Sequence, residues 1–386
     1  MASFILFSPW DVSARFEYLK GIKDKFPGKR VSGRCEMQVS NDIGRRNVMI
    51  KLGVIGAGRF GTNILNTFSQ LEREGLCELS AICDSERQVL EAQVKRYNAR
   101  GYLDYRQMLE TEKEINAVAV STPDHLHKEP ALYAAGLGKH VMVEKPLDVT
   151  VGGCREIIEA CREKNVLLQV DFHKRYDPFH LSVRQDVMEG RIGRIGYGHA
   201  YMEDKIVVPR DWFRGWAHMS SPVWFLGIHF LDLIRWILQS DAKTVYARGR
   251  KSLLRDLGID TYDWVSTTVE FENGAAVSFD MSWILPEGFE SIVNQGFKLV
   301  GENGIIECDS QDRGTRVSYG KEGVMTRNPV FINERIDRSG RIKYSGYGIE
   351  SIADFVYNLV YLEKGGSLAG LSGGITALGE DGLEST

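Results

Sequence analysis

The feature that most constrains the fold is an apolar run followed at once by closely spaced glycines. Residues Ile50–Ile55 suit a buried strand, and three glycines follow with the spacing Gly-x-Gly-x-x-Gly, namely Gly56, Gly58 and Gly61. Apolar residues then recur at helical spacing over residues 64–71. In such a strand, turn and helix, the first glycine permits a tight turn, the second lets a phosphate approach the backbone, and the third lets helix and strand pack closely. The segment therefore predicts a dinucleotide site at the edge of a parallel sheet.

Strands and helices alternate through the first part of the chain. Short strands are expected at four further places, namely Glu78–Cys83, Asn116–Ser121, Val141–Val143 and Val166–Val170. Segments with helical spacing lie between them, and the helix after the second strand is expected to close at Gly101. This alternation predicts an α/β fold whose amino-terminal part is a Rossmann domain with a doubly wound parallel sheet.

The order of elements changes near residue 173, where strands begin to follow one another. A long helix is expected at Val223–Leu238, after an irregular, tryptophan-rich loop at Val207–Ser221. The strands expected around it are Ile195–Met202, Thr244–Arg250, Trp264–Glu272, Ala275–Trp283, Phe297–Val300 and Ile305–Cys308. They predict a carboxyl-terminal α+β domain with a large, mostly antiparallel open sheet.

The expected organisation has three parts. Residues 1–48 show no domain-like pattern and precede Met49 and the first strand, so we interpret them as an extension of uncertain status. Residues 49–172 are expected to form the dinucleotide-binding Rossmann domain, and residues 173–386 the α+β domain that binds substrate and mediates oligomerisation.

Composition excludes several classes of function. The 386 residues have a formal net charge of -4 and no long basic block, so neither nucleic acid nor a membrane is an expected partner. Charged residues interrupt the apolar helix at Val223–Leu238, which indicates a buried helix rather than a membrane span. The six cysteines form no Cys-x-x-Cys pair and no cluster with zinc-ligand spacing, so we expect free thiols, a cytoplasmic location and no metal.

An acidic residue ends the second expected strand. Asp84 lies 23 residues after Gly61, where its carboxylate can accept hydrogen bonds from the hydroxyls of an adenosine ribose. A 2′-phosphate would meet a like charge there, which favours NAD as the cofactor. Arg87 lies three residues further on and offers such a phosphate a partner, so NADP stays possible.

Polar residues follow the third and fourth strands as well. The third strand runs into a turn made of Ser121, Thr122 and Pro123. His127 comes next, and the fourth strand delivers Glu144 and Lys145 directly before Pro146, which stops the strand. Because the carboxyl ends of parallel strands meet at one edge, we expect Lys145 where cofactor and substrate meet and His127 against the nicotinamide.

Taken in order, these motifs resemble the glucose-fructose oxidoreductase and inositol dehydrogenase family, often written Gfo/Idh/MocA. The matching residues are Gly56-x-Gly58-x-x-Gly61, Asp84, Thr122-Pro123-Asp124-x-x-His127, Glu144-Lys145-Pro146, Lys174-Arg175-Tyr176 and Gly227-Ile228-His229-x-x-Asp232. The resemblance runs from about Met49 to the end of the chain. It implies an NAD(P)-dependent dehydrogenase or reductase that transfers a hydride between the CH–OH group of a sugar, polyol or related carbohydrate and the nicotinamide. It also implies a homodimer or homotetramer.

The resemblance further implies that Lys145 and His229 are the catalytic residues. A histidine with an ordinary pKa of ~6.5 suits a base at neutral pH, whereas a lysine cation can hold the substrate oxygen. Many family members have an aspartate four residues before the histidine, but here that position is Phe225. Asp232 can orient the His229 ring or contribute to packing. Either His229 works without the usual carboxylate, or another group enters, such as Tyr201, Asp204 or Asp211.

The other expected contacts divide between cofactor and substrate. Cofactor contacts are expected from Gly56, Gly58, Arg59, Phe60, Gly61, Asp84, Ser121, Thr122, Pro123, His127, Glu144, Lys145 and Arg175. Substrate contacts are expected from Lys145, Tyr201, Trp212, Trp216 and His229. The tryptophans can stack on sugar faces or fill a core or a dimer interface. Arg175, with Lys174, can contact the cofactor carboxamide or an anionic substrate, or it can lie at the domain junction.

Alternatives to a dehydrogenase with a dissociable cofactor stay open. The first is a non-catalytic, dinucleotide-binding sensor or regulatory protein of the same fold, with Phe225 as its main support. The second is an enzyme that holds NADP tightly and cycles it between two sugars. At the carboxyl end, residues 365–386 are glycine-rich. The resemblance implies a further helix beyond such a segment, so a truncated end is expected.

Overall fold

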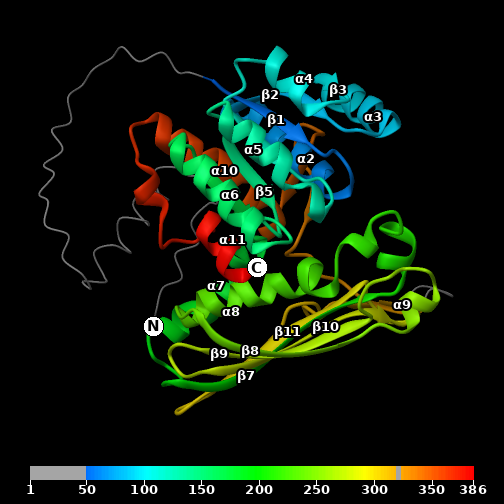
Figure 1. Ribbon diagram of the computed structural model, residues 1–386, viewed down its shortest axis with the longest axis vertical. Coiled ribbons are helices and arrows are strands. Elements are labelled where there is room, and N and C mark those ends of the chain that lie inside the picture. The colour runs from blue at the N-terminus through cyan, green and yellow to red at the C-terminus, as the bar shows by residue number, and fades with distance from the viewer. Residues whose placement is uncertain (1–48, 319–322) are drawn as a thin grey trace, which may run out of the picture. The chain divides into compact units, whose positions relative to one another are not determined.

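The computed structural model describes residues 49–318 and 323–386 (Figure 1), and the expected extension at residues 1–48 lies outside the described residues. Its first sheet has six strands in the order β3-β2-β1-β4-β5-β6, and every pair is parallel. The strands are β1 (Ile50–Ile55), β2 (Cys77–Cys83), β3 (Arg100–Tyr102), β4 (Ala117–Val120), β5 (His140–Glu144) and β6 (Leu168–Asp171). The helices that follow them are α2 (Arg59–Arg73), α3 (Arg87–Tyr97), α4 (Tyr105–Thr111), α5 (Lys128–Gly136) and α6 (Val151–Glu163). This sheet confirms the predicted Rossmann domain.

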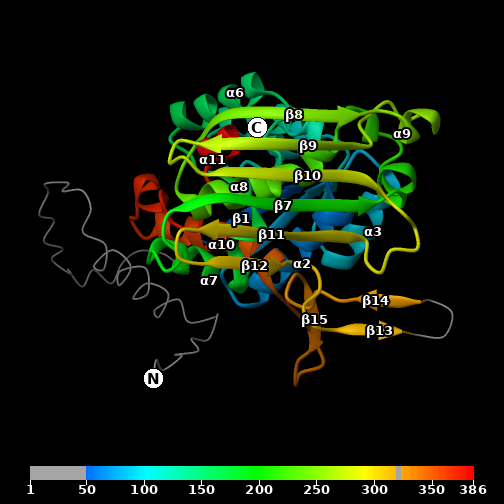
Figure 2. The same cartoon turned by 90° about the horizontal axis from the view of Figure 1, so that it is seen from below.

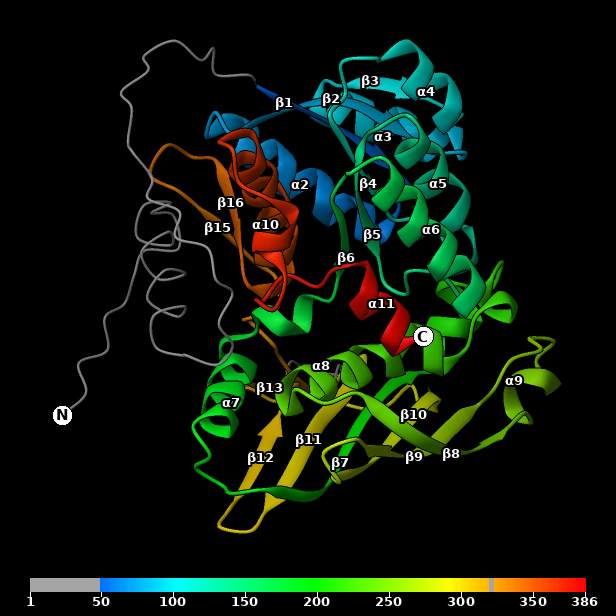
Figure 3. The same cartoon turned by 60° about the vertical axis from the view of Figure 1, so that its left-hand side comes forward.

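Strand β1 shows why this sheet forms. Leu52 and Val54 are fully buried, and burying each such side chain contributes about 1.5–3 kcal/mol. Between them, Gly53 leaves room for Met108 and Ile115, whose side chains would lie 3.2 Å from a Cβ at that position. Helices cover both faces of the sheet (Figure 3), so its strands are apolar throughout rather than alternating.

The second sheet also has six strands, in the order β12-β11-β7-β10-β9-β8. Its strands are β7 (Ile195–Lys205), β8 (Ala242–Arg250), β9 (Trp264–Phe271), β10 (Ala276–Leu285), β11 (Val293–Gly301) and β12 (Ile305–Asp309). Only β7 and β10 are parallel within it, so the sheet is mostly antiparallel as predicted. The helices α7 (Pro178–Met188) and α8 (Ile228–Leu238) lie on one face, and Figure 2 shows the other face uncovered by helices.

Several expected elements differ in detail from the structure. Short helical turns break the expected loop after β7, namely η3 (Val208–Trp212) and η4 (Ala217–Met219). The expected long helix begins as a π-helical turn, η5 (Val223–Gly227), before α8. Gly101 lies in strand β3 rather than closing a helix, since Asn98 in the left-handed conformation ends α3. Two hairpins were not predicted at all: β13 (Arg316–Ser318) with β14 (Val324–Thr326), and β15 (Asn333–Ile336) with β16 (Ile342–Ser345).

The carboxyl-terminal segment returns to the first sheet. Its elements are α10 (Tyr347–Glu363), η6 (Leu368–Leu371) and α11 (Gly379–Ser385). α10 packs against α2, while α11 packs against α6 and α8 (Figure 3). The amide of Val170 in β6 donates to the carbonyl of Ala377 at 2.9 Å, and Gln169 forms a bridge with Leu378. The glycine-rich segment therefore contains a packed helix, α11.

Two general expectations can be compared with the described residues. Cys77, Cys83, Cys154, Cys161 and Cys308 are free thiols, and Cys35 lies outside the described residues. Across residues 49–318 and 323–386, none of the helices is long and apolar enough to cross a membrane.

Candidate active site

The glycine turn has the geometry that a pyrophosphate requires. Gly56 has φ of +90°, and a Cβ there would lie 2.6 Å from the backbone of Ser121. A Cβ at Gly61 would lie 2.1 Å from the carbonyl oxygen of Gly56, so this position must be glycine. Nothing lies within 4 Å of a Cβ built on Gly58, and α2 begins directly after it. An anion can therefore approach the free amides at the start of the helix, which fits a dinucleotide.

Asp84 lies beside this turn, at the carboxyl end of β2. One carboxylate oxygen accepts from the amide of Ala57 at 2.8 Å, and the other accepts from the amide of Glu86 at 2.9 Å. The half-buried carboxylate is thus fixed next to the glycine turn, where a ribose is expected. The guanidinium of Arg87 is directed toward Glu91, 3.9 Å from its carboxylate, and most of the Arg87 side chain is exposed.

Lys145 lies at the carboxyl end of β5, just after the strand, and only 4% of it is exposed. Its ammonium donates to the carbonyl oxygen of Phe225 at 2.9 Å and lies 4.4 Å above the centre of the Phe225 ring. Position 225, where the family resemblance implies a carboxylate, thus offers Lys145 a backbone carbonyl and a ring face. Glu144 is 3.8 Å away, and a cis peptide bond joins Lys145 to Pro146.

A second carboxyl group lies beside Glu144. In the β5–β6 register Glu144 is the partner of Asp171, and both are buried. Burial, reinforced by the Asp171 carboxylate, raises the pKa of Glu144 well above its usual range, and burial raises the pKa of Asp171 to about 6. Two like charges this close cannot both be ionised easily, so the pair holds a proton near neutral pH.

His229, at the start of α8, faces another histidine. The ring centres of His229 and His173 are 4.6 Å apart, and His173 also stacks on Phe60 of the glycine turn at 6.1 Å. Burial, with Lys145 and other cations nearby, lowers the pKa of both histidines well below the usual value. Within the described part of the chain, Nδ1 of neither ring has a hydrogen-bond partner. These two neutral rings link the cofactor turn to the surroundings of Lys145.

His173 was not among the predicted site residues. It follows β6 by two residues, inside η2 (His173–Tyr176), so it lies at the same edge of the sheet as Lys145. The rule that placed Lys145 could therefore have found it.

The structure is inconsistent with the predicted role of His127. The side chain is 0% exposed, and both ring nitrogens already face carbonyl oxygens, those of Pro146 at 2.7 Å and Thr122 at 2.8 Å. His127 therefore braces the turn after β4 against the turn after β5 and has no free nitrogen for a nicotinamide. Ser121, whose hydroxyl donates to the carbonyl of Gly56, and Pro123 belong to the same bracing region.

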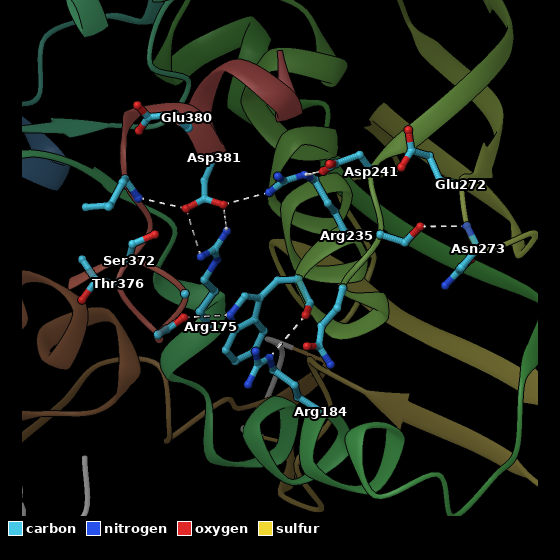
Figure 4. Close-up of a pocket in the computed structure, with 16 residues that line it drawn as sticks. Arg175, Arg184, Arg235, Asp241, Glu272, Asn273, Ser372, Thr376, Glu380 and Asp381 are labelled. Carbon is cyan, nitrogen blue, oxygen red and sulfur yellow. Dashed lines mark hydrogen bonds and ion pairs between the residues drawn. The ribbon is translucent and has the colours of Figure 1, made fainter. Parts of the chain in front are cut away.

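Arg175 does not reach the predicted cofactor site either. Its guanidinium donates to both carboxylate oxygens of Asp232, at 2.8 and 2.5 Å, and lies 3.1 Å from Asp381 of α11 (Figure 4). Arg235 joins the same network through Asp381. The network borders a cavity of about 690 Å³ at the carboxyl end of α8. Arg175 is thus a buried structural residue, and Asp232 pairs with it instead of orienting His229.

Tyr201 is directed away from the site. Along β7 buried and partly exposed residues alternate, and Tyr201 shares the outer face with His199, on which it stacks at 5.7 Å. Asp204 lies on the opposite, buried face. Asp211, the third candidate for the missing carboxylate, is exposed and paired with Arg210. Asp204 alone of the three faces the interior.

The two predicted tryptophans have different surroundings. Trp212 is partly exposed, and the guanidinium of Arg59 lies 4.1 Å from its ring centre, so the glycine turn touches the loop after β7. Trp216 packs into an aromatic cluster with Phe213 and Phe225, at 4.7 and 6.1 Å. Trp212 is therefore partly exposed with Arg59 at its ring, whereas Trp216 serves the packing around Phe225.

Comparison with known proteins identifies the family. Residues 50–172 match the sequence profile described as "Oxidoreductase family, NAD-binding Rossmann fold", and residues 180–307 match that of the "GFO/IDH/MocA C-terminal domain". These ranges cover more than half of the chain. The protein therefore belongs to the GFO/IDH/MocA family of NAD-binding oxidoreductases, as its motifs predicted.

Individual relatives agree with this assignment. The chain is 29% identical over 284 residues to inositol 2-dehydrogenase 2 of Saccharopolyspora erythraea, covering 71% of this chain and 77% of that protein. Two solved structures share the fold over 87% of this chain and 94% of theirs. Myo-inositol 2-dehydrogenase of Lactobacillus plantarum has a TM-score of 0.71 at 20% identity, and scyllo-inositol dehydrogenase of Lactobacillus casei, with bound NAD(H) and scyllo-inositol, has 0.67 at 19%.

Proposed function

We propose that this protein oxidises a carbinol of a cyclic polyol or sugar with NAD, or reduces the corresponding ketone. The observation that supports this most is the cluster in which the Lys145 charge acts on the buried His229 ring, and His229 is joined to the glycine turn through His173 and Phe60. A cofactor turn and an acid–base pocket meet at one edge of the sheet, as hydride transfer requires.

The residues divide the work as follows. Bound nicotinamide supplies the hydride acceptor. The Lys145 ammonium, buried and held by the Phe225 carbonyl, is positioned to hold the reacting oxygen and to stabilise negative charge on it. His229 is the base that the sequence predicts, and its neutral ring lies beside His173 and near Lys145. Trp212 and the Arg59 side chain at its face are candidates for covering the sugar ring.

The names of the relatives support a polyol substrate. The Saccharopolyspora protein is named an inositol dehydrogenase, and the Lactobacillus casei structure contains scyllo-inositol beside NAD(H). An inositol or another ring polyol is therefore the first substrate class to test. A panel of inositols, sugars and sugar acids, monitored by cofactor absorbance, tests the proposal directly. No cofactor reduction with any member, despite NAD binding, would favour the non-catalytic sensor instead.

Asp84 gives a prediction on cofactor choice. Replacing Asp84 by alanine removes the ribose acceptor and the like charge that a 2′-phosphate would meet. We expect the KM for NAD to rise about tenfold, from the loss of hydrogen bonds to a charged group, and the KM for NADP to fall. Steady-state kinetics with both cofactors measure the change. Glu86→Ala, two residues away with an exposed side chain, is the control and should behave as the wild type. An unchanged preference in Asp84→Ala would exclude this role.

The uncovered face of the second sheet is the candidate surface for a homodimer or homotetramer. Its strands β7 and β8 carry the exposed tyrosines Tyr197 and Tyr246. Light scattering after size exclusion measures the assembly, and a monomer at micromolar concentration would contradict this part of the proposal.

A further inference from the structure

We infer that Asp204 is the catalytic base of this chain: its carboxylate, rather than the His229 ring, receives the proton of the reacting hydroxyl. This inference rests on the proposed function and deepens it, because it concerns the same pocket. It also explains how the chain manages without a carboxylate at position 225.

The strand geometry directs Asp204 toward the site. Ala200, Met202 and Asp204 share the buried face of β7, and the first two belong to the core that also contains residues of η5 and α8. η5 packs against β7 and β10. It is also the element whose Phe225 carbonyl accepts from Lys145. Asp204, the last buried residue of β7, therefore lies on the side of the sheet that faces Lys145.

A second lysine approaches from the neighbouring strand. The ammonium of Lys174 donates to the side-chain oxygen of Gln295 in β11. In the β11–β7 register Gln295 is the partner of Met202, two residues before Asp204 on the same face. Asp204 therefore follows, on the same face of β7, the residue that pairs with Gln295, and Gln295 is the residue that Lys174 contacts.

The carboxylate is unpartnered although it is 2% exposed. Among residues 49–318 and 323–386, no hydrogen-bond donor and no cation within ion-pair distance contacts it, whereas Asp232, equally buried, is paired twice by Arg175. Buried carboxylates without a partner are costly and are found mainly at functional sites. A buried carboxylate with a free acceptor, near the Lys145 ammonium, is what a substrate hydroxyl needs.

The charges around Asp204 allow it to hold the proton. The charged groups near it are Lys145, after β5, and Lys174, in η2. Burial raises the pKa of Asp204 to about 8, against the pull of the two lysines, whereas burial lowers the pKa of His229 well below its usual value. A group with the higher pKa binds the proton more tightly, so the ionised Asp204 carboxylate, which forms as the pH rises through about 8, is the stronger base of the two.

The step balances with the residues and cofactor already named. The substrate O–H bond breaks and its proton goes to an Asp204 oxygen. The C–H bond breaks with both electrons, which leave as hydride to the nicotinamide, and the carbon–oxygen double bond forms. Lys145 holds the substrate oxygen throughout, and the neutral His229 ring orients that oxygen.

Asp204→Asn is the decisive variant, and Glu203→Gln is its matched control. Glu203 is the adjacent residue on the outer face of β7, where it accepts from Asn294. For the wild type we expect the oxidation rate to rise as the pH passes through about 8, because only the ionised carboxylate accepts a proton. Asp204→Asn should lower kcat by about 10²–10⁴-fold, leave the KM for NAD unchanged and abolish this rise, while Glu203→Gln keeps it. Asp204→Glu should restore part of the rate. A wild-type pH profile retained in Asp204→Asn, or a midpoint below 6.5, would assign the proton to His229 and overturn the inference.

An infrared titration separates this inference from the proposed function. The carbonyl stretch of a protonated carboxylic acid in the holoenzyme should disappear as the pH rises through about 8, and this component should be missing in Asp204→Asn but present in Glu203→Gln. If no polyol is oxidised by the wild type, the proposed function fails, and the titration still shows whether Asp204 exchanges a proton near neutrality. A spectrum identical in wild type and Asp204→Asn would refute the inference even in an active enzyme.

Discussion

Replacing Lys145 by alanine is expected to lower polyol-dependent NAD reduction by about 10²–10³-fold or more while leaving NAD affinity unchanged. The ammonium can hold a developing alkoxide, and it is already fixed by the Phe225 carbonyl. The glycine turn and Asp84 make no hydrogen bond with it, so cofactor binding should survive. Turnover on the best substrate of the panel, together with calorimetric NAD binding, measures both quantities.

Lys139→Ala is the matched control, because Lys139 precedes the same strand at its opposite end and donates only to the carbonyl of Lys113. It should retain both activity and cofactor binding. Substantial activity in Lys145→Ala would show that another group stabilises the reacting oxygen. A parallel loss of NAD binding would instead indicate that Lys145 supports the cofactor site rather than the chemistry.

Arg175→Met is expected to lower the free energy of unfolding by about 3–5 kcal/mol. It leaves Asp232 buried with its bidentate partner removed, and breaking one half of a buried pair costs more than removing both. Arg175→Met/Asp232→Leu should recover much of this loss, because no buried charge is then stranded. Urea denaturation of the two variants measures the difference.

Arg194→Met provides the scale for this effect. Arg194 pairs with Glu302, but its side chain is 89% exposed, so solvent screens the pair and its contribution to stability is small. If Arg175→Met were no more destabilised than Arg194→Met, the buried network would not be a structural tie. Loss of NAD affinity without loss of stability would restore Arg175 to the cofactor site, as the sequence first suggested.

Local patterns predicted the parts of the site that local geometry determines. The glycine turn, the strand before it and the position of Lys145 follow from residues that are neighbours in the chain. Strand periodicity and glycine conformation act over a few residues, so a single sequence contains them. The family motifs added His229, which lies 84 residues from Lys145 and has no local link to it.

Side-chain direction was the main source of error. His127 and Arg175 do follow strands at the correct edge, but position at that edge does not determine whether a polar group faces the ligand or satisfies a buried neighbour. The partner of Arg175 is Asp232, which lies 57 residues away in the sequence. No local sequence pattern predicts such a pair. Long-range partners of this kind could not be predicted from one sequence.

The choice between Tyr201 and Asp204 could have been made from the alternation of residues along the strand. Successive residues of a strand point to opposite faces, so Tyr201 and Asp204, three residues apart, cannot face the same side. Ala200 and Met202 are the apolar residues of β7 that suit a core, which places Asp204 inward and Tyr201 outward. This parity argument was available from the sequence alone.

The strand-like bridge between β6 and the segment before α11 has a consequence for how the molecule unfolds. The Ala377 carbonyl satisfies an amide at the edge of the first sheet, and Asp381, four residues later, holds Arg175 and Arg235. The last ten residues are thus shared between elements that precede and follow residue 172. We therefore expect a single cooperative melting transition for residues 49–386, so a fragment ending at residue 172 is a poor surrogate for cofactor-binding studies.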